Sequence, residues 1–347
     1  MKRLAIILIV LIFSISILAS CSSPEPKRYE AQFLGLFDTV TQIVAYTESK
    51  SEFEDYVNTI HDELEIYNNL YDIYKDYEGI NNLKTINDNA GIAPVEVDKK
   101  IIDLLLFARD AYEMTDGYVN VAFGSVLSIW HDYREKGTED PDLAELPSYS
   151  LLFEAVEHTD IDAIVINEEE STVFLSDDGM KLDVGAIAKG FAIEKVAMKL
   201  YDLGFDSGLI SVGGNVRAIG TKDNDIPWNL GIQNPDISSD QTNIHLVNLM
   251  DSSLVTSGDY IRYYTVDGKR YHHIIDPNTL YPAEQFKSVT IICRDSGLAD
   301  MLSTALYMMP FEKGLALLDN IPGSHAVWIE NDGNEKFSPG FESFLSD

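Results

Sequence analysis

The spacing of hydrophobic and polar positions predicts a chain in which hairpins alternate irregularly with helices. Strand-like runs cover residues 36–46, 161–167, 172–176, 209–212, 216–219, 228–233, 244–249, 261–266 and 270–275. Apolar positions at helical spacing cover residues 51–67, 101–114, 296–309 and 311–318. The pair Asp267-Gly268 predicts a tight hairpin turn. This mixture indicates an α+β fold rather than a regular strand–helix–strand array.

The most informative stretch is Lys181–Gly190, which predicts a strand end, a turn of small residues and the start of a helix that ends near Gly204. A helix start presents free N–H groups, and Lys189 adds a positive charge, so the stretch suits a phosphate or diphosphate. Asp183 suits a hydroxyl, an amine or a metal-bound water instead. The alternative is a turn packed for structural reasons, with Lys189 on the surface.

The N-terminus predicts export. Lys2 and Arg3 precede an apolar run over residues 4–18, which is typical of a secretory signal and short for a membrane span of about 20 residues. Leu18-Ala19-Ser20-Cys21 looks like a bacterial lipobox. We therefore expect residues 1–20 to be a lipoprotein signal peptide, 21–30 a tether after lipidated Cys21, and 31–347 one domain. An uncleaved anchor helix is the alternative, and it too places the domain outside the cytoplasm.

The net charge argues against one class of ligand, and the cysteine count predicts that the chain has no disulfide. The chain has 57 Asp and Glu against 25 Lys and Arg, a net charge of −32, which argues against nucleic acid. An anionic ligand would therefore need a local basic pocket or a metal cation. Cys293 is the only cysteine besides Cys21, so we expect no disulfide, with Cys293 buried in a strand.

Two further patterns could carry chemistry. Asp300 and Thr304 lie one turn apart on a predicted helix, and their oxygen atoms suit Mg²⁺; the alternative is a simple contact near a helix start. His272 and His273 are adjacent in a predicted strand and should face opposite sides. Either histidine could accept a proton from a hydroxyl or be a packed strand residue.

Several segments, in chain order, resemble motifs of the ApbE family of FAD:protein FMN transferases. The resemblance rests on Thr115–Asn120 (TDGYVN, beside the family's TDGAFD), Asp183–Gly190 (DVGAIAKG), Gly213-Gly214-Asn215, Ser257–Tyr260 (SGDY), His273–Thr279 (HIIDPNT) and Ala299–Thr304 (ADMLST). Leu280 stands where the family usually has Gly. The ordered set covers most of the predicted mature domain and is more specific than any single motif.

The resemblance implies a single α+β domain, with mixed or antiparallel sheets flanked by helices in a T-fold-like arrangement. It implies Mg²⁺-dependent transfer of FMN from FAD to a Thr or Ser hydroxyl of an extracytoplasmic partner flavoprotein, with release of AMP. That partner would belong to a membrane redox system or be a secreted FMN-binding domain. Water as the acceptor, giving FAD hydrolysis, and a lipoprotein that only binds FAD are the alternatives. The Asp300/Thr304 pair favours an enzyme, because a carrier needs no Mg²⁺ at the diphosphate.

The resemblance also implies residue roles. His273, Asp183 and Lys189 would be catalytic, and the metal would be held by Asp300, Thr304 and the backbone carbonyl of Ala186. The residues expected to contact FAD are Tyr74, Tyr118, Val119, Asn120, Asp183, Lys189, Gly213, Gly214, Asn215, Ser257, Gly258, Asp259, His273 and Ile274.

Overall fold

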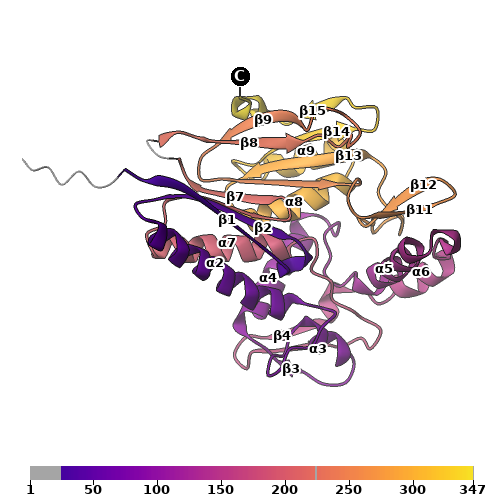
Figure 1. Cartoon of the computed structure of the whole chain (residues 1–347). Helices are drawn as coiled ribbons and strands as arrows, with labels where there is room; N and C mark the ends of the chain where they lie inside the picture. Colours follow the sequence, from indigo (N-terminus) through magenta and orange to yellow (C-terminus); the bar gives the residue numbers. More distant parts are fainter. Residues whose placement is uncertain (1–24, 223–224, 347) are drawn as a thin grey trace, which may run out of the picture.

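A computed structural model describes residues 25–222 and 225–346 (Figure 1). Its centre is an eight-stranded antiparallel sheet. In spatial order its strands are β1 (Lys27–Leu34), β2 (Val40–Thr47), β6 (Ser207–Val212), β7 (Asn215–Gly220), β10 (Ser253–Gly258), β13 (Phe286–Cys293), β14 (His325–Glu330) and β15 (Glu335–Phe337). The predicted signal peptide and Cys21 lie outside the described residues. Within them, no helix combines the length and apolarity that crossing a membrane requires.

Three small sheets and a set of helices complete the fold. The small sheets are β3 (Val95–Glu96) with β5 (Thr172–Leu175) and β4 (Ile164–Asn167), β8 (Trp228–Gln233) with β9 (Asn243–Leu249), and β11 (Tyr263–Val266) with β12 (Lys269–His272). The described α-helices are α2 (Lys50–Tyr71), α3 (Leu83–Asp88), α4 (Lys99–Met114), α5 (Gly124–Glu139), α6 (Tyr149–Val156), α7 (Ala188–Asp202), α8 (Ser296–Met308) and α9 (Phe311–Asp319). The α+β class predicted from the sequence is confirmed.

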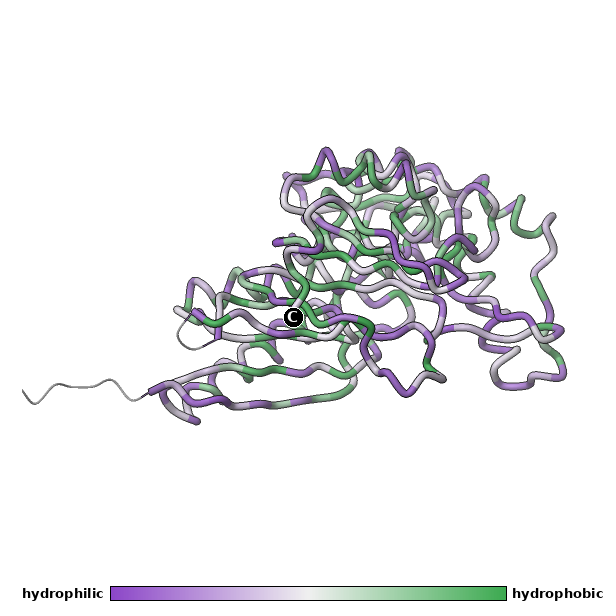
Figure 2. The backbone as a smooth tube through the Cα atoms, turned by 90° about the horizontal axis from the view of Figure 1, so that it is seen from above, coloured by the Kyte–Doolittle hydropathy of each residue, from purple (hydrophilic) through white to green (hydrophobic). Residues whose placement is uncertain are grey.

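The large sheet separates two hydrophobic layers. Helices α2, α7 and α8 pack on one face, and the β8–β9 hairpin covers part of the other (Figure 1). Strand β13 is buried on both faces, since Ile291 belongs to the helix-side core and Ile292 to the hairpin-side core. This explains its unbroken apolar sequence, and Cys293 is buried there, as expected. Hydrophobic residues recur along the central elements, and hydrophilic ones dominate many projecting turns (Figure 2).

A separate lobe is formed by α5, α6 and the β11–β12 hairpin, to the right in Figure 1. Its core includes Phe123, Trp130, Tyr264 and Leu280. Leu280 has the left-handed φ of 63° and donates its N–H to Asp276, while its carbonyl accepts from Trp130 Nε1 at 2.9 Å. The backbone at this position is therefore the kind that Gly adopts freely. Burial of the Leu280 side chain offsets the roughly 1–2 kcal/mol that a left-handed residue costs.

Several local predictions were wrong in informative ways. Strand β1 begins at Lys27, inside the expected tether, and so extends the ordered domain toward the N-terminus. The first three residues of the strand predicted over 36–46 are a short 3-10 helix with Phe37 at a positive φ. Helix α2 begins at Lys50, one residue before the predicted start, and is capped by Ser49, whose hydroxyl accepts from the Glu52 N–H at 3.2 Å. Strand β10 was missed, and β12 ends at His272 instead of 275.

Helices α7 and α8 approach each other most closely at Gly190. A Cβ added there would lie 2.2 Å from the carbonyl oxygen of Ser296 and 2.4 Å from the Cβ of Asp300. The absence of a side chain lets the Gly190 N–H donate to Asp300 Oδ2 at 2.8 Å. One turn further along α7, Glu194 accepts the Ser296 N–H at 2.9 Å and also pairs with buried Arg217 at 3.0 Å. These contacts fix the starts of the two helices relative to each other.

We predict that Gly190→Ala destabilises the fold by about 1–3 kcal/mol, because the new methyl group overlaps backbone atoms of α8 that cannot move independently. Urea unfolding of the purified domain measures the change. The control is Gly314→Ala in α9, whose added Cβ would lie 3.2 Å from Leu306 Cγ and 3.5 Å from the Trp328 ring. These contacts are longer and involve side chains only, and alanine favours a helix interior, so this variant should cost clearly less than Gly190→Ala. Equal stability of wild type and Gly190→Ala would contradict the assigned packing.

Candidate active site

The turn before α7 is held by hydrogen bonds rather than by a sheet. Leu182 exchanges two backbone hydrogen bonds with the Asn87 side chain, at 2.7 and 3.0 Å, and the Asp183 N–H donates to Val121. A single bridge at Lys181 replaces the predicted strand end. Asp183 Oδ1 accepts the Gly185 N–H at 2.8 Å and so shapes the turn. The predicted helix start is confirmed, with α7 beginning at Ala188.

Asp183 is half-buried, and burial raises the pKa of its carboxyl group. The Gly185 hydrogen bond and then the neighbouring basic side chains His131, Arg134 and Lys189 oppose this rise. Asp183 therefore lies among basic side chains, of which only Lys189 was expected from the sequence. The region is a local basic patch in a strongly acidic protein.

Asp300 is 4% exposed and lies on the first half of α8. Its Oδ2 accepts from Gly190, and within residues 25–222 and 225–346 it has no Lys, Arg or His partner within 4.0 Å. A nearly buried carboxylate without a cationic partner is costly, so this position fits a bound cation. Thr304 is half-buried one turn later, and its hydroxyl is 3.5 Å from that of Ser257. Ser257 also contacts the Ser303 hydroxyl at 2.8 Å.

This donor set is oxygen-only and carries a single carboxylate. In the described part of the chain, no cluster of three or more His, Cys, Asp and Glu side chains is arranged to hold a metal. A hard cation that keeps water and substrate oxygens among its ligands needs few protein groups. The Asp300 carboxylate, the Thr304 hydroxyl and the Ala186 carbonyl, in the half-buried turn before α7, fit Mg²⁺ on those terms and would not hold a soft metal.

His273 follows directly after β12. Both its backbone N–H and its Nδ1 lie within hydrogen-bond distance of the Arg262 carbonyl, at 3.1 and 3.3 Å. Nδ1 therefore carries the proton, which leaves Nε2 as the acceptor. Burial first, and then Arg262, His272 and Arg134, lowers the pKa of His273 to about 3. The free protein thus holds this imidazole neutral.

His272 is buried on the opposite side, as predicted. Its Nε2 contacts the Ala283 carbonyl at 2.7 Å and its Nδ1 accepts the Ile274 N–H at 3.2 Å. Its ring meets Tyr307 edge to face at 5.6 Å. Both ring nitrogens of His272 contact backbone groups inside the protein, so His272 has a structural role. Its hydrogen bond with the Ile274 N–H also fixes the position of Ile274.

Tyr74, His131 and Arg134 form a stacked group beside Asp183. Tyr74 stacks on the His131 ring with centroids 5.1 Å apart, and Arg134 Nη2 lies 2.9 Å from His131 Nδ1. The pKa of Tyr74 is raised to about 12, first by burial of its hydroxyl and then by the Asp183 carboxylate. The sequence predicts only a short helix ending near Tyr133 in this region, so His131 and Arg134 were not among the expected site residues. Their i,i+3 spacing was the signal that could have found them.

The glycine-rich and SGDY motifs lie at the ends of neighbouring sheet strands. Gly213 and Gly214 have φ of 58° and 94° in the β6–β7 turn, a conformation that favours glycine. The following Asn215 is buried, and its side-chain N–H₂ has no hydrogen-bond partner among the described residues. Asp259 is half-buried with a pKa raised by burial, next to Gly258 at the end of β10.

The side chain of Asn120 in the TDGYVN segment makes hydrogen bonds within the protein. The Asn120 amide donates to the Thr159 carbonyl at 2.8 Å and accepts the Ala122 N–H at 2.9 Å, so it holds two loops together. Val119 is buried, while Tyr118 is half-buried with the Lys313 ammonium 4.7 Å from its ring centre. Of this trio, Tyr118 offers an accessible aromatic face, Asn120 is half-buried, and Val119 is enclosed.

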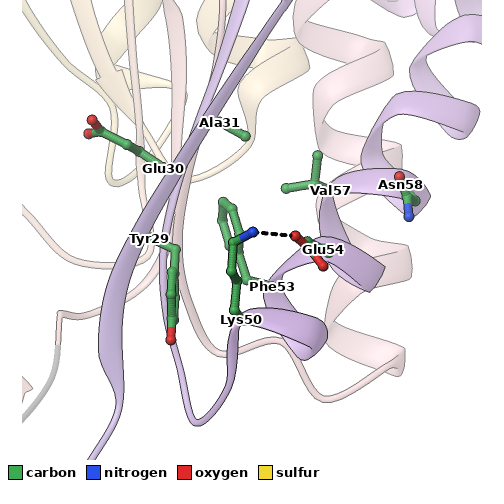
Figure 3. A pocket seen from close by; sticks show the side chains of 8 residues that line it. All are labelled: Tyr29, Glu30, Ala31, Lys50, Phe53, Glu54, Val57 and Asn58. Atoms are coloured by element: carbon green, nitrogen blue, oxygen red, sulfur yellow. Dashed lines mark ion pairs between the residues drawn. The ribbon is translucent and has the colours of Figure 1, made fainter.

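A hollow of about 400 Å³ is lined by Gly117, Asn120 and Pro277, among others, and so joins the TDGYVN segment to the loop after His273. Another, about 250 Å³, lies between β1 and α2, where Lys50 pairs with Glu54 (Figure 3). It contains none of the predicted site residues.

Comparison with known proteins identifies the family of this chain. The ApbE family model matches residues 37–329. An FAD:protein FMN transferase of Treponema pallidum is 37% identical over 74% of this chain and 73% of its own length. One from Klebsiella pneumoniae is 32% identical over 78% of this chain and 83% of its own length. The ApbE protein of Thermotoga maritima superposes with a TM-score of 0.80 at 31% identity, over 92% of this chain and all of that chain. The chain therefore belongs to the ApbE family.

Proposed function

We propose that this protein transfers FMN from FAD to a Thr or Ser hydroxyl of a partner flavoprotein and releases AMP, with Mg²⁺ at the diphosphate. The observation that carries the proposal is the Gly190–Asp300 hydrogen bond. It joins a helix start bearing Lys189 to a nearly buried carboxylate without a cationic partner among the described residues. The FMN-transferase relatives support the same activity.

The diphosphate would lie at the N-terminus of α7. Its oxygens would accept N–H groups of the first turn and contact Lys189, since a helix start attracts anions. Mg²⁺, held by Asp300, Thr304 and the Ala186 carbonyl, would neutralise diphosphate charge as it does in other phosphoryl transfers. The unpaired amide of Asn215 and the turn at Gly213 and Gly214 would approach the same ligand.

The remaining predicted residues would surround the flavin nucleotide. Tyr74 and Tyr118 offer aromatic faces, while Ser257, Gly258 and Asp259 border the metal side. Val119, Asn120 and Ile274 would act through the backbone and loop positions that they fix. Asp183 has Oδ2 available for a substrate hydroxyl or a metal-bound water, because Oδ1 is committed to Gly185.

His273 would accept the proton of the acceptor hydroxyl through Nε2. The hydroxyl oxygen then bonds to the FMN phosphorus, the bond from that phosphorus to the bridging oxygen breaks, and AMP leaves with the electron pair. A base with a pKa of about 3 is weak in the free protein. The negative diphosphate would offset the nearby Arg262 and Arg134 charges and raise that pKa toward the range in which proton transfer is efficient.

The same proposal places the domain outside the cytoplasm, anchored by lipid on Cys21, next to a membrane redox protein. Its support is the basic, apolar and lipobox pattern of residues 1–21.

Intact-mass measurement tests the transfer. The protein would be incubated with FAD, Mg²⁺ and a purified FMN-binding domain of a membrane redox complex, with AMP measured in parallel. We expect the acceptor to gain the mass of FMN less one water, with one AMP for each adduct. Free FMN and AMP without an adduct would instead indicate a hydrolase. Bound but unchanged FAD would indicate a carrier.

The free protein should lose stability on acidification partly through His273. Its folded pKa of about 3 lies below the ordinary 6.5, so the unfolded chain binds more protons between these values. The stabilisation is present above pH 6.5 and is lost as the pH falls toward 3. We expect the melting temperature to fall less between pH 7 and 5 in His273→Asn than in wild type. The control, His61→Asn on α2, should keep the wild-type profile, and parallel wild-type and His273→Asn profiles would contradict a neutral, desolvated His273.

A further inference from the structure

Two arginines from different elements of the α5 lobe lie next to the candidate base. Arg262 precedes β11, and its carbonyl accepts both the backbone N–H and the Nδ1–H of His273. Arg134 comes from α5, whose Trp130 donates to the loop after His273 through the Leu280 carbonyl. The two guanidinium groups also act on each other, because Arg262 contributes to the lowered pKa of half-buried Arg134. Both arginines also act on His273, whose pKa they help to lower, so the lobe presents two positive charges near this ring.

Neither guanidinium is paired with an acid. Among the described residues, no carboxylate oxygen lies within 4.0 Å of Arg134 or Arg262. The same is true of Arg109 and Arg270, whereas Arg28, Arg217 and Arg294 each have such a partner. Arg134 is half-buried and Arg262 is exposed, so an anion bound between them would relieve the repulsion that the half-buried guanidinium experiences.

Arg134 is also held in position. His131 Nδ1 accepts from its Nη2 at 2.9 Å, and the other ring nitrogen of His131 is 3.2 Å from Glu135. The His131 ring is in turn stacked on Tyr74. This arrangement fixes the plane of the guanidinium and leaves its other N–H groups for a ligand. Such preorganisation lowers the cost of binding.

We propose that Arg134 and Arg262 bind the diphosphate of FAD from the side opposite Lys189 and the start of α7. Guanidinium groups match phosphate oxygens in pairs of parallel hydrogen bonds, which ammonium groups cannot form. The diphosphate is then clamped between the α5 lobe and the α7–α8 layer. Because Arg262 is tied to His273, it contacts the phosphate that the acceptor hydroxyl attacks. This inference rests on FAD as the substrate of the proposed function.

The test compares Arg134→Gln and Arg262→Gln with Arg270→Gln, a matched control. Arg270 lies exposed on the same hairpin and covers the Tyr263 ring at 4.6 Å. Affinity for FAD and for riboflavin, which has no phosphate, is measured by flavin fluorescence with Mg²⁺ present. Each site variant should bind FAD about 10- to 100-fold more weakly, as for loss of a charge-assisted hydrogen bond. Riboflavin affinity should change less than about twofold, and Arg→Lys variants should recover part of the loss.

Several outcomes would overturn the assignment. Unchanged FAD affinity in both site variants would contradict a contact between the arginines and the diphosphate. An equal loss of affinity for FAD and riboflavin, in a protein that melts normally, would contradict it too. A raised KM for the acceptor protein alone would assign the arginines to the acceptor instead. Adduct formation by wild type is measured in the same series. If no adduct forms but FAD affinity still depends on both arginines, the transferase proposal fails while the diphosphate assignment stands.

Discussion

The packing of α7 against α8 at Gly190 is the constraint on which the site depends. It brings the N-terminal turn of one helix, with Lys189, against Asp300 of the other, and a single hydrogen bond of 2.8 Å fixes their register. Glu194 reinforces it by joining the start of α8 to the buried Arg217 of β7. Because both helices lie on the same face of the large sheet, the strand ends at Gly213 and Ser257 reach the same region.

The second organising feature is the distribution of charge. A protein with a net charge of −32 repels a nucleotide diphosphate at long range. The basic side chains around Asp183 counter this locally, and they come from both the α5 lobe and the start of α7. One of them, Arg134, also acts on His273: burial first, and then Arg262, His272 and Arg134, keep this imidazole unprotonated in the free protein. The same charges therefore suit anion binding and link the state of the base to occupation of the site.

The sequence predicted features that depend on local chemistry. The helix over α8 and the Asp267-Gly268 turn, with φ of 50° and 78°, follow from periodicity and turn preference. The roles of Arg134 and Asn120 could not be predicted in this way. Arg134 lies on a polar part of α5 whose helical state depends on packing against β11, and Asn120 is committed to a carbonyl 39 residues away. Strand β10 was not predicted, because its six residues end in a motif that is typical of a turn.

Leu280 shows a different limit of sequence reasoning. Leu280 stands where the family usually has glycine, yet its backbone has a positive φ and its side chain joins the lobe core. Whether such a residue is tolerated depends on the free energy of burial, and the neighbours that provide it come from α5 and β11. Long-range packing of this kind also sets the strand ends at β1 and β12. Local patterns therefore located the motifs better than the segments that support them.

The proposed Mg²⁺-dependent transfer depends most on Asp300, which would be the only charged protein ligand of the cation beside the diphosphate. A Mg²⁺ titration of FMN transfer in wild type and Asp300→Asn tests this directly, with a thermal melt to verify folding. The substitution keeps the side-chain size and an oxygen that can still accept from Gly190, but removes the negative charge. We expect the Mg²⁺ requirement to rise sharply and transfer to be lost at ordinary Mg²⁺, with a weaker defect in Thr304→Val. Wild-type Mg²⁺ dependence in a folded Asp300→Asn protein would contradict the account.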